Sequence, residues 1–89
     1  MIVTVYAAGV FDGDTFYTSN SESIRLADVN APETGTLGAP YATDLLYSLV
    51  GQQFVQVETV AKDPYGRFVC NVWVNGKDVN ETMRRAGFT

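Results

Sequence analysis

The chain has 89 residues, of which 46% are hydrophobic and 12% aromatic, so it is long enough for one globular domain and too apolar for a disordered segment. Its formal net charge is -4, which excludes the broadly basic surface typical of proteins that hold long nucleic acids. The single cysteine, Cys70, excludes an internal disulfide and is expected to be a small core residue.

The first half of the chain is predicted to form a β-meander. Residues 2–11 are rich in β-branched and aromatic side chains, which favours a strand, and Gly9 is expected to form a bulge within it. Asp12-Gly13 predicts a hairpin turn, since glycine tolerates positive φ and aspartate can bond to its own backbone. Residues 15–18 and 23–29 are predicted to form the next two strands.

The second half of the chain mixes helix with strand. Apolar residues recur at helical spacing over residues 41–50, and Gly51 stands where a left-handed C-terminal cap belongs. An amphipathic helix is therefore expected there. Further strands are predicted at residues 54–60 and 68–74, the second of them with alternating apolar positions.

The last segment predicts a hairpin followed by a short helix. Asn75-Gly76 is the strongest hairpin signal in the chain, and Asn80 is expected to cap a helix over residues 81–86 that Gly87 closes. The whole pattern predicts a mainly β fold with helices (α+β). We expect a five-stranded Greek-key barrel of the oligonucleotide-binding (OB) type, with one inserted helix and a short C-terminal helix, as a single domain over residues 1–89.

Four short segments carry chemistry: Asp12-Gly13-Asp14-Thr15, Arg25-Leu26, Asn30-Ala31-Pro32-Glu33 and Tyr65-Gly66-Arg67. Taken singly, each is an ordinary turn, a solvated charge or the exit of a strand. Together they offer carboxylates for a hard metal ion, a carboxylate placed to act as a base, and two guanidiniums able to grip a phosphate. That combination indicates a phosphodiesterase.

In this order, the segments resemble those of the staphylococcal nuclease (thermonuclease) family. The matches also include Asp63-Pro64 before the Tyr-Gly-Arg turn and Val79-Asn80-Glu81 near the last helix, so the resemblance runs from about residue 3 to residue 88. The resemblance implies an OB-fold barrel and a calcium-dependent endonuclease that hydrolyses the phosphodiester bonds of DNA and RNA. The products would carry a 3′-phosphate and a 5′-hydroxyl.

The resemblance also implies a calcium site. Asp14 matches a carboxylate ligand of the Ca²⁺ ion, Asn30 stands where the family normally has a second aspartate ligand, and the backbone carbonyl of Ala31 matches a third ligand. Asp12 and Thr15 would support the turn that bears the metal. Because an amide oxygen brings no charge, we expect weak calcium binding, with a dissociation constant on the order of millimolar.

The catalytic residues implied by the resemblance are Arg25, Glu33 and Arg67. Glu33 matches the carboxylate that acts as general base toward the attacking water. The two arginines match the guanidiniums that neutralise the phosphate as charge builds in the transition state. Tyr65 matches a residue that contacts a nucleotide phosphate of the substrate, which is expected to be single-stranded DNA or RNA.

Two departures from the family leave a second function open. The uncharged Asn30 weakens the metal site, and the family domain usually continues past residue 87 with a further helix. We therefore expect weakened activity, and either an exposed apolar patch or a homo-oligomer that covers it. The alternative to an enzyme is a non-catalytic OB-fold module that binds single-stranded nucleic acid or protein.

The location of the protein is unknown from the sequence. No apolar run approaches the roughly 18 residues of a membrane span, so no membrane partner is expected. No signal peptide is evident at Met1, which makes the cytoplasm the default and leaves open secretion from a longer precursor.

Overall fold

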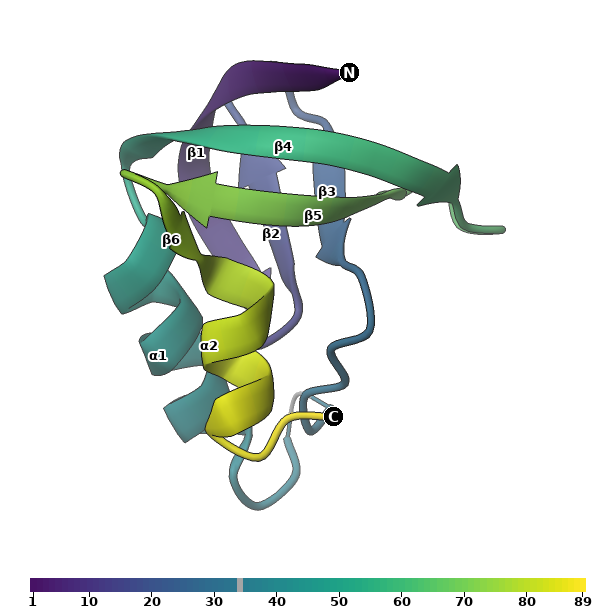
Figure 1. Cartoon of the computed structure of the whole chain (residues 1–89). Coiled ribbons are helices and arrows are strands. Elements are labelled where there is room, and N and C mark those ends of the chain that lie inside the picture. Colours follow the sequence, from purple (N-terminus) through teal and green to yellow (C-terminus); the bar gives the residue numbers. More distant parts are fainter. Residues whose placement is uncertain (34) are drawn as a thin grey trace.

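Five strands close into a small barrel in the computed structural model, which describes residues 1–33 and 35–89 (Figure 1). The strands are β1 (Ile2–Asp12), β2 (Thr15–Thr18), β3 (Ser23–Leu26), β4 (Gln53–Lys62) and β5 (Phe68–Val74). They are ordered β3-β2-β1-β4-β5, and a parallel pairing of β3 with β5 closes the barrel. This confirms the predicted mainly β fold of OB type.

Two helices pack at one end of the barrel, below the strands in Figure 1. Helix α1 (Ala39–Val50) is inserted between β3 and β4, and helix α2 (Val79–Arg85) ends the chain. Both bury apolar side chains in the common core: Leu46 and Val50 come from α1, and Met83 comes from α2. Burying these side chains removes apolar surface from water, which is the main force that holds the helices on the barrel.

Strand β1 bends around the barrel through irregularities in its pairing with β2. The register shifts between Ala7 and Gly9, which confirms the predicted bulge at Gly9, and again between Val10 and Asp12. The side chain of Tyr17 lies over Gly9, where an added Cβ would be 2.2 Å from the tyrosine Oη. A side chain at residue 9 would therefore push the ring away from the strand.

The bounds of several elements differ from the prediction. Strand β3 ends at Leu26 rather than at residue 29, because Asp28 has a positive φ of 56° that turns the chain out of the sheet. Helix α1 begins two residues earlier than predicted, with Pro40 in its first turn, where proline is tolerated. The strand predicted at residues 54–60 extends over Gln53–Lys62.

The chain leaves α1 without the predicted left-handed glycine cap. Gly51 has φ of -56°, so this prediction was wrong, and the positive φ falls instead on Gln52, at 53°. The hairpin predicted at Asn75-Gly76 is confirmed, with positive φ at both residues, as a type I′ turn requires. It leads into the two-residue strand β6 (Lys77–Asp78), which the sequence analysis did not predict.

Helix α2 begins at Val79 and is capped by Asp78, whose side chain accepts a hydrogen bond from the N–H of Glu81 at 2.9 Å. The prediction that Asn80 caps the helix was therefore wrong, since Asn80 lies inside the helix and is buried. Cys70 is fully buried in the core, as predicted. Among the described residues, no helix is both long and apolar enough to cross a membrane.

Candidate active site

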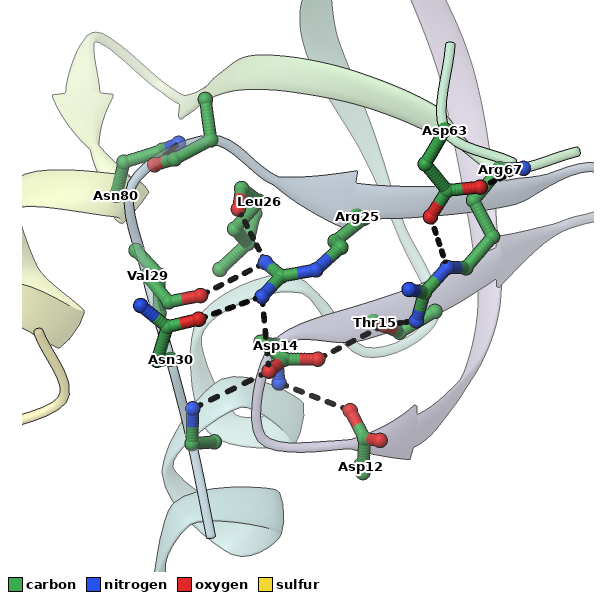
Figure 2. A network of polar contacts seen from close by, with 12 residues as sticks. Asp12, Asp14, Thr15, Arg25, Leu26, Val29, Asn30, Asp63, Arg67 and Asn80 are labelled. Atoms are coloured by element: carbon green, nitrogen blue, oxygen red, sulfur yellow. Dashed lines mark hydrogen bonds and ion pairs between the residues drawn. The ribbon is translucent and has the colours of Figure 1, made fainter. Parts of the chain in front are cut away.

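One cavity of about 290 Å³ collects most of the residues singled out in the sequence. Its lining is Asp12, Asp14, Arg25, Asn30, Ala31, Glu33 and Arg67. These residues come from the β1–β2 turn, from β3 and the segment after it, and from the turn between β4 and β5 (Figure 2). Thr15 and Tyr65 line a neighbouring cavity that also contains Arg67.

The β1–β2 turn holds the Asp14 carboxylate in a fixed position. Asp14 Oδ1 accepts a hydrogen bond from the Thr15 hydroxyl at 2.9 Å, and Oδ2 accepts one from the Ala31 N–H at 3.2 Å. The N–H of Asp14 in turn donates to Asp12 Oδ1 at 3.0 Å. Asp12 and Thr15 therefore support Asp14 through these contacts, as expected for the turn.

Gly13 makes this turn possible for a reason other than the predicted one. Gly13 is not among the described residues with positive φ. A Cβ at residue 13 would instead lie 2.5 Å from the Cβ of Ala42 in α1 and 2.6 Å from the Cβ of Ala31. The turn thus packs directly against α1 and against the segment that follows β3, and only glycine allows this approach.

Arg25 is anchored by the segment that follows its own strand (Figure 2). Its Nη1 donates hydrogen bonds to the carbonyls of Leu26, at 2.8 Å, and Val29, at 2.7 Å. Its Nη2 donates to Asn30 Oδ1 at 2.8 Å and lies 3.6 Å from Asp14 Oδ2. One guanidinium therefore lies against both side chains expected to bind the metal.

Arg67 is anchored by Asp63, whose importance the sequence analysis missed. Asp63 Oδ2 accepts a hydrogen bond from Arg67 Nε at 2.5 Å, and Oδ1 accepts the N–H groups of Tyr65, at 3.0 Å, and Arg67, at 2.9 Å. Arg67 Nη1 also donates to Thr15 Oγ1 at 3.3 Å. The signal in the sequence is an aspartate two residues before Tyr65, which is typical of a turn closed by its own side chain.

The charges in the site shift the pKa values of two carboxyl groups. Burial raises the pKa of Asp12, and the negative charge of Asp14 beside it raises that pKa further. Burial alone would raise the pKa of Asp63 as well. The hydrogen bonds from Arg67 and Tyr65 and the positive charge of Arg67 outweigh it, and the pKa of Asp63 lies below its ordinary value of 3.8. Asp63 is therefore held as a carboxylate that can pair with Arg67.

Glu33 lies at the rim of the cavity, in the segment between β3 and α1. The residue is exposed, and its backbone carbonyl accepts hydrogen bonds from the N–H of Thr36 at 3.0 Å and from the Thr36 hydroxyl at 2.5 Å. These bonds fix its backbone while leaving the side chain near water. A solvated carboxylate in a cavity that also contains two arginines can accept a proton from water, which is what a general base requires.

Asn80 supports the site from behind, a role that the sequence analysis also missed. Its Nδ2 donates hydrogen bonds of 3.0 Å to the carbonyls of Ala27 and Cys70, and its Oδ1 accepts the N–H of Val72 at 2.9 Å. The carbonyl of Ala27 also accepts a hydrogen bond from Arg84 at 3.3 Å. Helix α2 thereby fixes the start of the segment that leads from β3 to Asn30.

The oxygen atoms of the cavity are of the kind that calcium prefers. Three carboxylate residues (Asp12, Asp14 and Glu33) and one amide residue (Asn30) line it, together with Ala31. Among the described residues, no group of three or more His, Cys, Asp or Glu side chains is placed to hold a metal ion. The residues therefore fit calcium by their chemistry and offer it little negative charge.

Comparison with known proteins gives consistent matches. A family model described as "Staphylococcal nuclease homologue" matches residues 23–89, which include Arg25, Glu33 and Arg67 but not Asp14. A protein named "Uncharacterized endonuclease" from Escherichia coli is 38% identical over 82 residues, covering 88% of this chain and 54% of that protein. "Endonuclease YncB" from Bacillus subtilis (strain 168) is 32% identical over 98 residues, covering 97% of this chain and 46% of that protein. The chain spans about half the length of these two relatives.

Proposed function

This chain belongs to the staphylococcal nuclease homologue family, and from that premise we propose that it hydrolyses phosphodiester bonds of DNA or RNA. The observation that carries the proposal is the single cavity that contains Arg25, Glu33 and Arg67 beside Asp14. A binding module would need cations to hold a phosphate. It would have no use for a solvated carboxylate in the same cavity, whose negative charge opposes phosphate binding.

In the proposed reaction, Arg25 and Arg67 hold the scissile phosphate. Each guanidinium is fixed by acceptors on its own segment, so neither has to be ordered when substrate binds. The positive charge of both guanidiniums offsets the charge that builds on the phosphate oxygens in the transition state. Preorganised cations of this kind stabilise the transition state more than the ground state.

Glu33 is proposed to act as the general base. It takes a proton from a water molecule whose oxygen attacks phosphorus, and the bond from phosphorus to the 5′-oxygen breaks. The leaving oxygen is protonated by solvent. The products then carry a 3′-phosphate and a 5′-hydroxyl.

Calcium is the proposed cofactor, held by Asp14, the amide oxygen of Asn30 and the carbonyl of Ala31, with Asp12 behind Asp14. When bound, the ion supplies positive charge that polarises water and phosphate oxygens. The Asn30 oxygen accepts a hydrogen bond from Arg25, so metal binding must compete with that bond. Weak calcium affinity is expected because Asn30 is uncharged and because its oxygen is already hydrogen-bonded to Arg25.

The same contact favours a second function. Arg25 donates a hydrogen bond to the Asn30 oxygen and lies 3.6 Å from Asp14 Oδ2. With these contacts, the site needs no metal ion to balance its charge. Such a site could bind the phosphates of single-stranded nucleic acid without cutting them. The family's catalytic residues would then persist only as a phosphate-binding surface.

One assay separates the two functions. A single-stranded DNA oligonucleotide labelled at one end is incubated with the protein in calcium, with the protein in EGTA, and with Glu33→Gln in calcium. The proposal expects cleavage in the first arm only, with a rate loss on the order of 100-fold or more for the variant. Binding without cleavage in all three arms would instead establish the binding module.

A further inference from the structure

Phe11 is an exposed aromatic residue that the proposed reaction does not use. It stands near the end of β1, directly before Asp12, and 72% of its surface is exposed. An exposed phenylalanine at the end of a strand costs solvation free energy and contributes little to the core. Phe11 lines a cavity that shares Arg67 with the catalytic cavity, so its open ring is placed to contact a substrate held there.

Phe11 lines a cavity of about 480 Å³ that adjoins the catalytic one. The other lining residues are Thr15, Ser23, Tyr65 and Arg67. Arg67 lines both cavities, so a chain whose phosphate is held by Arg67 passes directly from one cavity into the other. The described lining of this second cavity contains one cation, three hydroxyls (those of Thr15, Ser23 and Tyr65) and two aromatic rings, and no carboxylate.

Phe11 also lines a third cavity, of about 370 Å³, which is a poorer site for a polyanion. It is lined by the start of α1 and by Asp44, and none of its lining residues is a cation. Electrostatics therefore favours the cavity that contains Arg67.

The Arg67 cavity contains two exposed aromatic rings, those of Tyr65 and Phe11. Tyr65 is 84% exposed, and the guanidinium carbon of Arg67 lies 5.5 Å from the centre of its ring, within the range of a cation–π contact. Phe11 adds a second open ring to the same cavity. Aromatic faces beside a fixed cation are what proteins use to hold the bases and phosphates of single strands.

We propose that Phe11 is a stacking platform for an unpaired base next to the scissile phosphate, and that it makes the site selective for single strands. This inference rests on the proposed nuclease function. In a duplex, each base face is covered by its neighbours, so only a splayed base can stack on Phe11. The residue binds substrate and takes no part in bond cleavage.

The first test measures binding of a fluorescent single-stranded oligonucleotide to the Glu33→Gln protein in calcium, by anisotropy. Adding Phe11→Ala is expected to weaken binding at least about fivefold, the lower end for loss of a base–aromatic stack. Phe11→Trp should restore binding and Phe11→Leu should not, because leucine keeps apolar volume but has no ring. The matched control is Phe54→Ala, since Phe54 is also exposed, at 69%, and lines neither of the cavities around Phe11.

The second test uses a substrate with one abasic nucleotide, moved in turn through the positions beside the cleavage site. At one position, the effect of Phe11→Ala should disappear, because there is no base left to stack. Equal effects on every substrate, or full binding by Phe11→Leu, would overturn the inference and show a hydrophobic contact instead. A protein that binds single strands through Phe11 yet never cuts them would overturn the proposed function alone, and unchanged binding of single strands by Phe11→Ala would overturn this inference alone.

Discussion

Asn30 connects the two halves of the candidate site, because its side-chain oxygen contacts Arg25, which is proposed to hold the phosphate and lies beside Asp14, a proposed metal ligand. It accepts a hydrogen bond from Arg25 Nη2, the same nitrogen that lies 3.6 Å from Asp14 Oδ2. An amide at this position therefore orients Arg25 while adding no charge to the metal site. Calcium affinity should therefore be low, and a substitution that places a negative charge at residue 30 should raise it.

Asn30→Asp is expected to tighten calcium binding on the order of tenfold, because affinity at oxygen sites rises with the number of charged ligands. Isothermal titration calorimetry measures the change. The control is Asn20→Asp, which adds the same charge in the exposed turn after β2 and should leave the affinity unchanged. Equal affinities for the wild type and Asn30→Asp would show that residue 30 does not bind the ion.

Asp63→Asn is expected to lower kcat/KM roughly 10- to 100-fold by releasing Arg67 from its position, a loss typical of a misplaced catalytic group. The variant keeps an acceptor for the backbone N–H groups but replaces the Oδ2 that accepts from Arg67 Nε. Asp78→Asn is the matched control, since asparagine caps a helix about as well as aspartate. Equal losses in both variants would point to general destabilisation.

Most of the candidate site could be predicted from the sequence, because its residues stand in short segments of characteristic composition. The structure places the predicted Asp14, Arg25, Asn30, Glu33 and Arg67 around one cavity. The anchoring residues could not be predicted in the same way. Asn80 acts through contacts with backbone groups whose positions are known only once the barrel has closed. Asp63 closes its own turn, but its contact with the side chain of Arg67 shows its role only in the structure.

At the level of elements, the β1–β2 turn is fixed in place by α1. Gly13 lies against Ala42 of α1 and Ala31 of the segment after β3, so three separate elements meet at the turn that carries Asp14. Any side chain at residue 13 must separate them. The position of Asp14 therefore depends on helix packing as well as on the turn itself.

Gly13→Ala is expected to destabilise the protein by about 1–3 kcal/mol, the usual cost of an overpacked contact, and to reduce cleavage by the folded protein about tenfold or more. Urea unfolding and kcat/KM measure the two effects. Gly76→Ala is the control, because its φ of 80° is strained for alanine but no atom lies within 4 Å of the added Cβ. If Gly13→Ala lost only stability, as the control should, the turn would not position the site.

The predicted elements that were correct are those set by local pattern. The strand at Phe68–Val74 has the predicted bounds because alternating apolar side chains specify it, and the strand at Thr15–Thr18 has them because it lies between two turns. The errors occur where tertiary contacts decide. Asn80 is of a residue type that often caps helices, but its amide donates hydrogen bonds to the buried carbonyls of Ala27 and Cys70. Asp78 caps the helix instead.

At the scale of the whole molecule, the positive charge available to a nucleic acid is small. Of the six cations in the chain, Arg84 and Arg85 both pair with Glu81. Arg25 and Arg67 line the candidate active-site cavity and pair with Asp14 and Asp63. The net charge of -4 opposes the approach of a polyanion. Substrate binding should therefore depend on a few local contacts, and self-association of the chain stays a prediction.

The salt dependence of binding should reflect those few contacts. With two guanidiniums neutralising phosphates, the logarithm of the affinity for single strands should fall with the logarithm of salt concentration with a slope of about -1.4. Anisotropy titrations at fixed calcium concentration measure this slope. A slope steeper than about -3 would require further cations in contact with the strand.

The central claim is that this cavity cuts the strand it binds, and single-turnover kinetics with Glu33→Gln tests it most directly. With protein in excess over a labelled single-stranded oligonucleotide in calcium, binding no longer limits the rate. The account predicts that the variant cleaves more slowly than the wild type by a factor on the order of 100 or greater. Its dissociation constant for the oligonucleotide should stay within about threefold of the wild-type value, a difference of less than about 1 kcal/mol. Equal cleavage rates for the two proteins would contradict the assignment of Glu33, and the absence of cleavage by the wild type would contradict the enzyme itself.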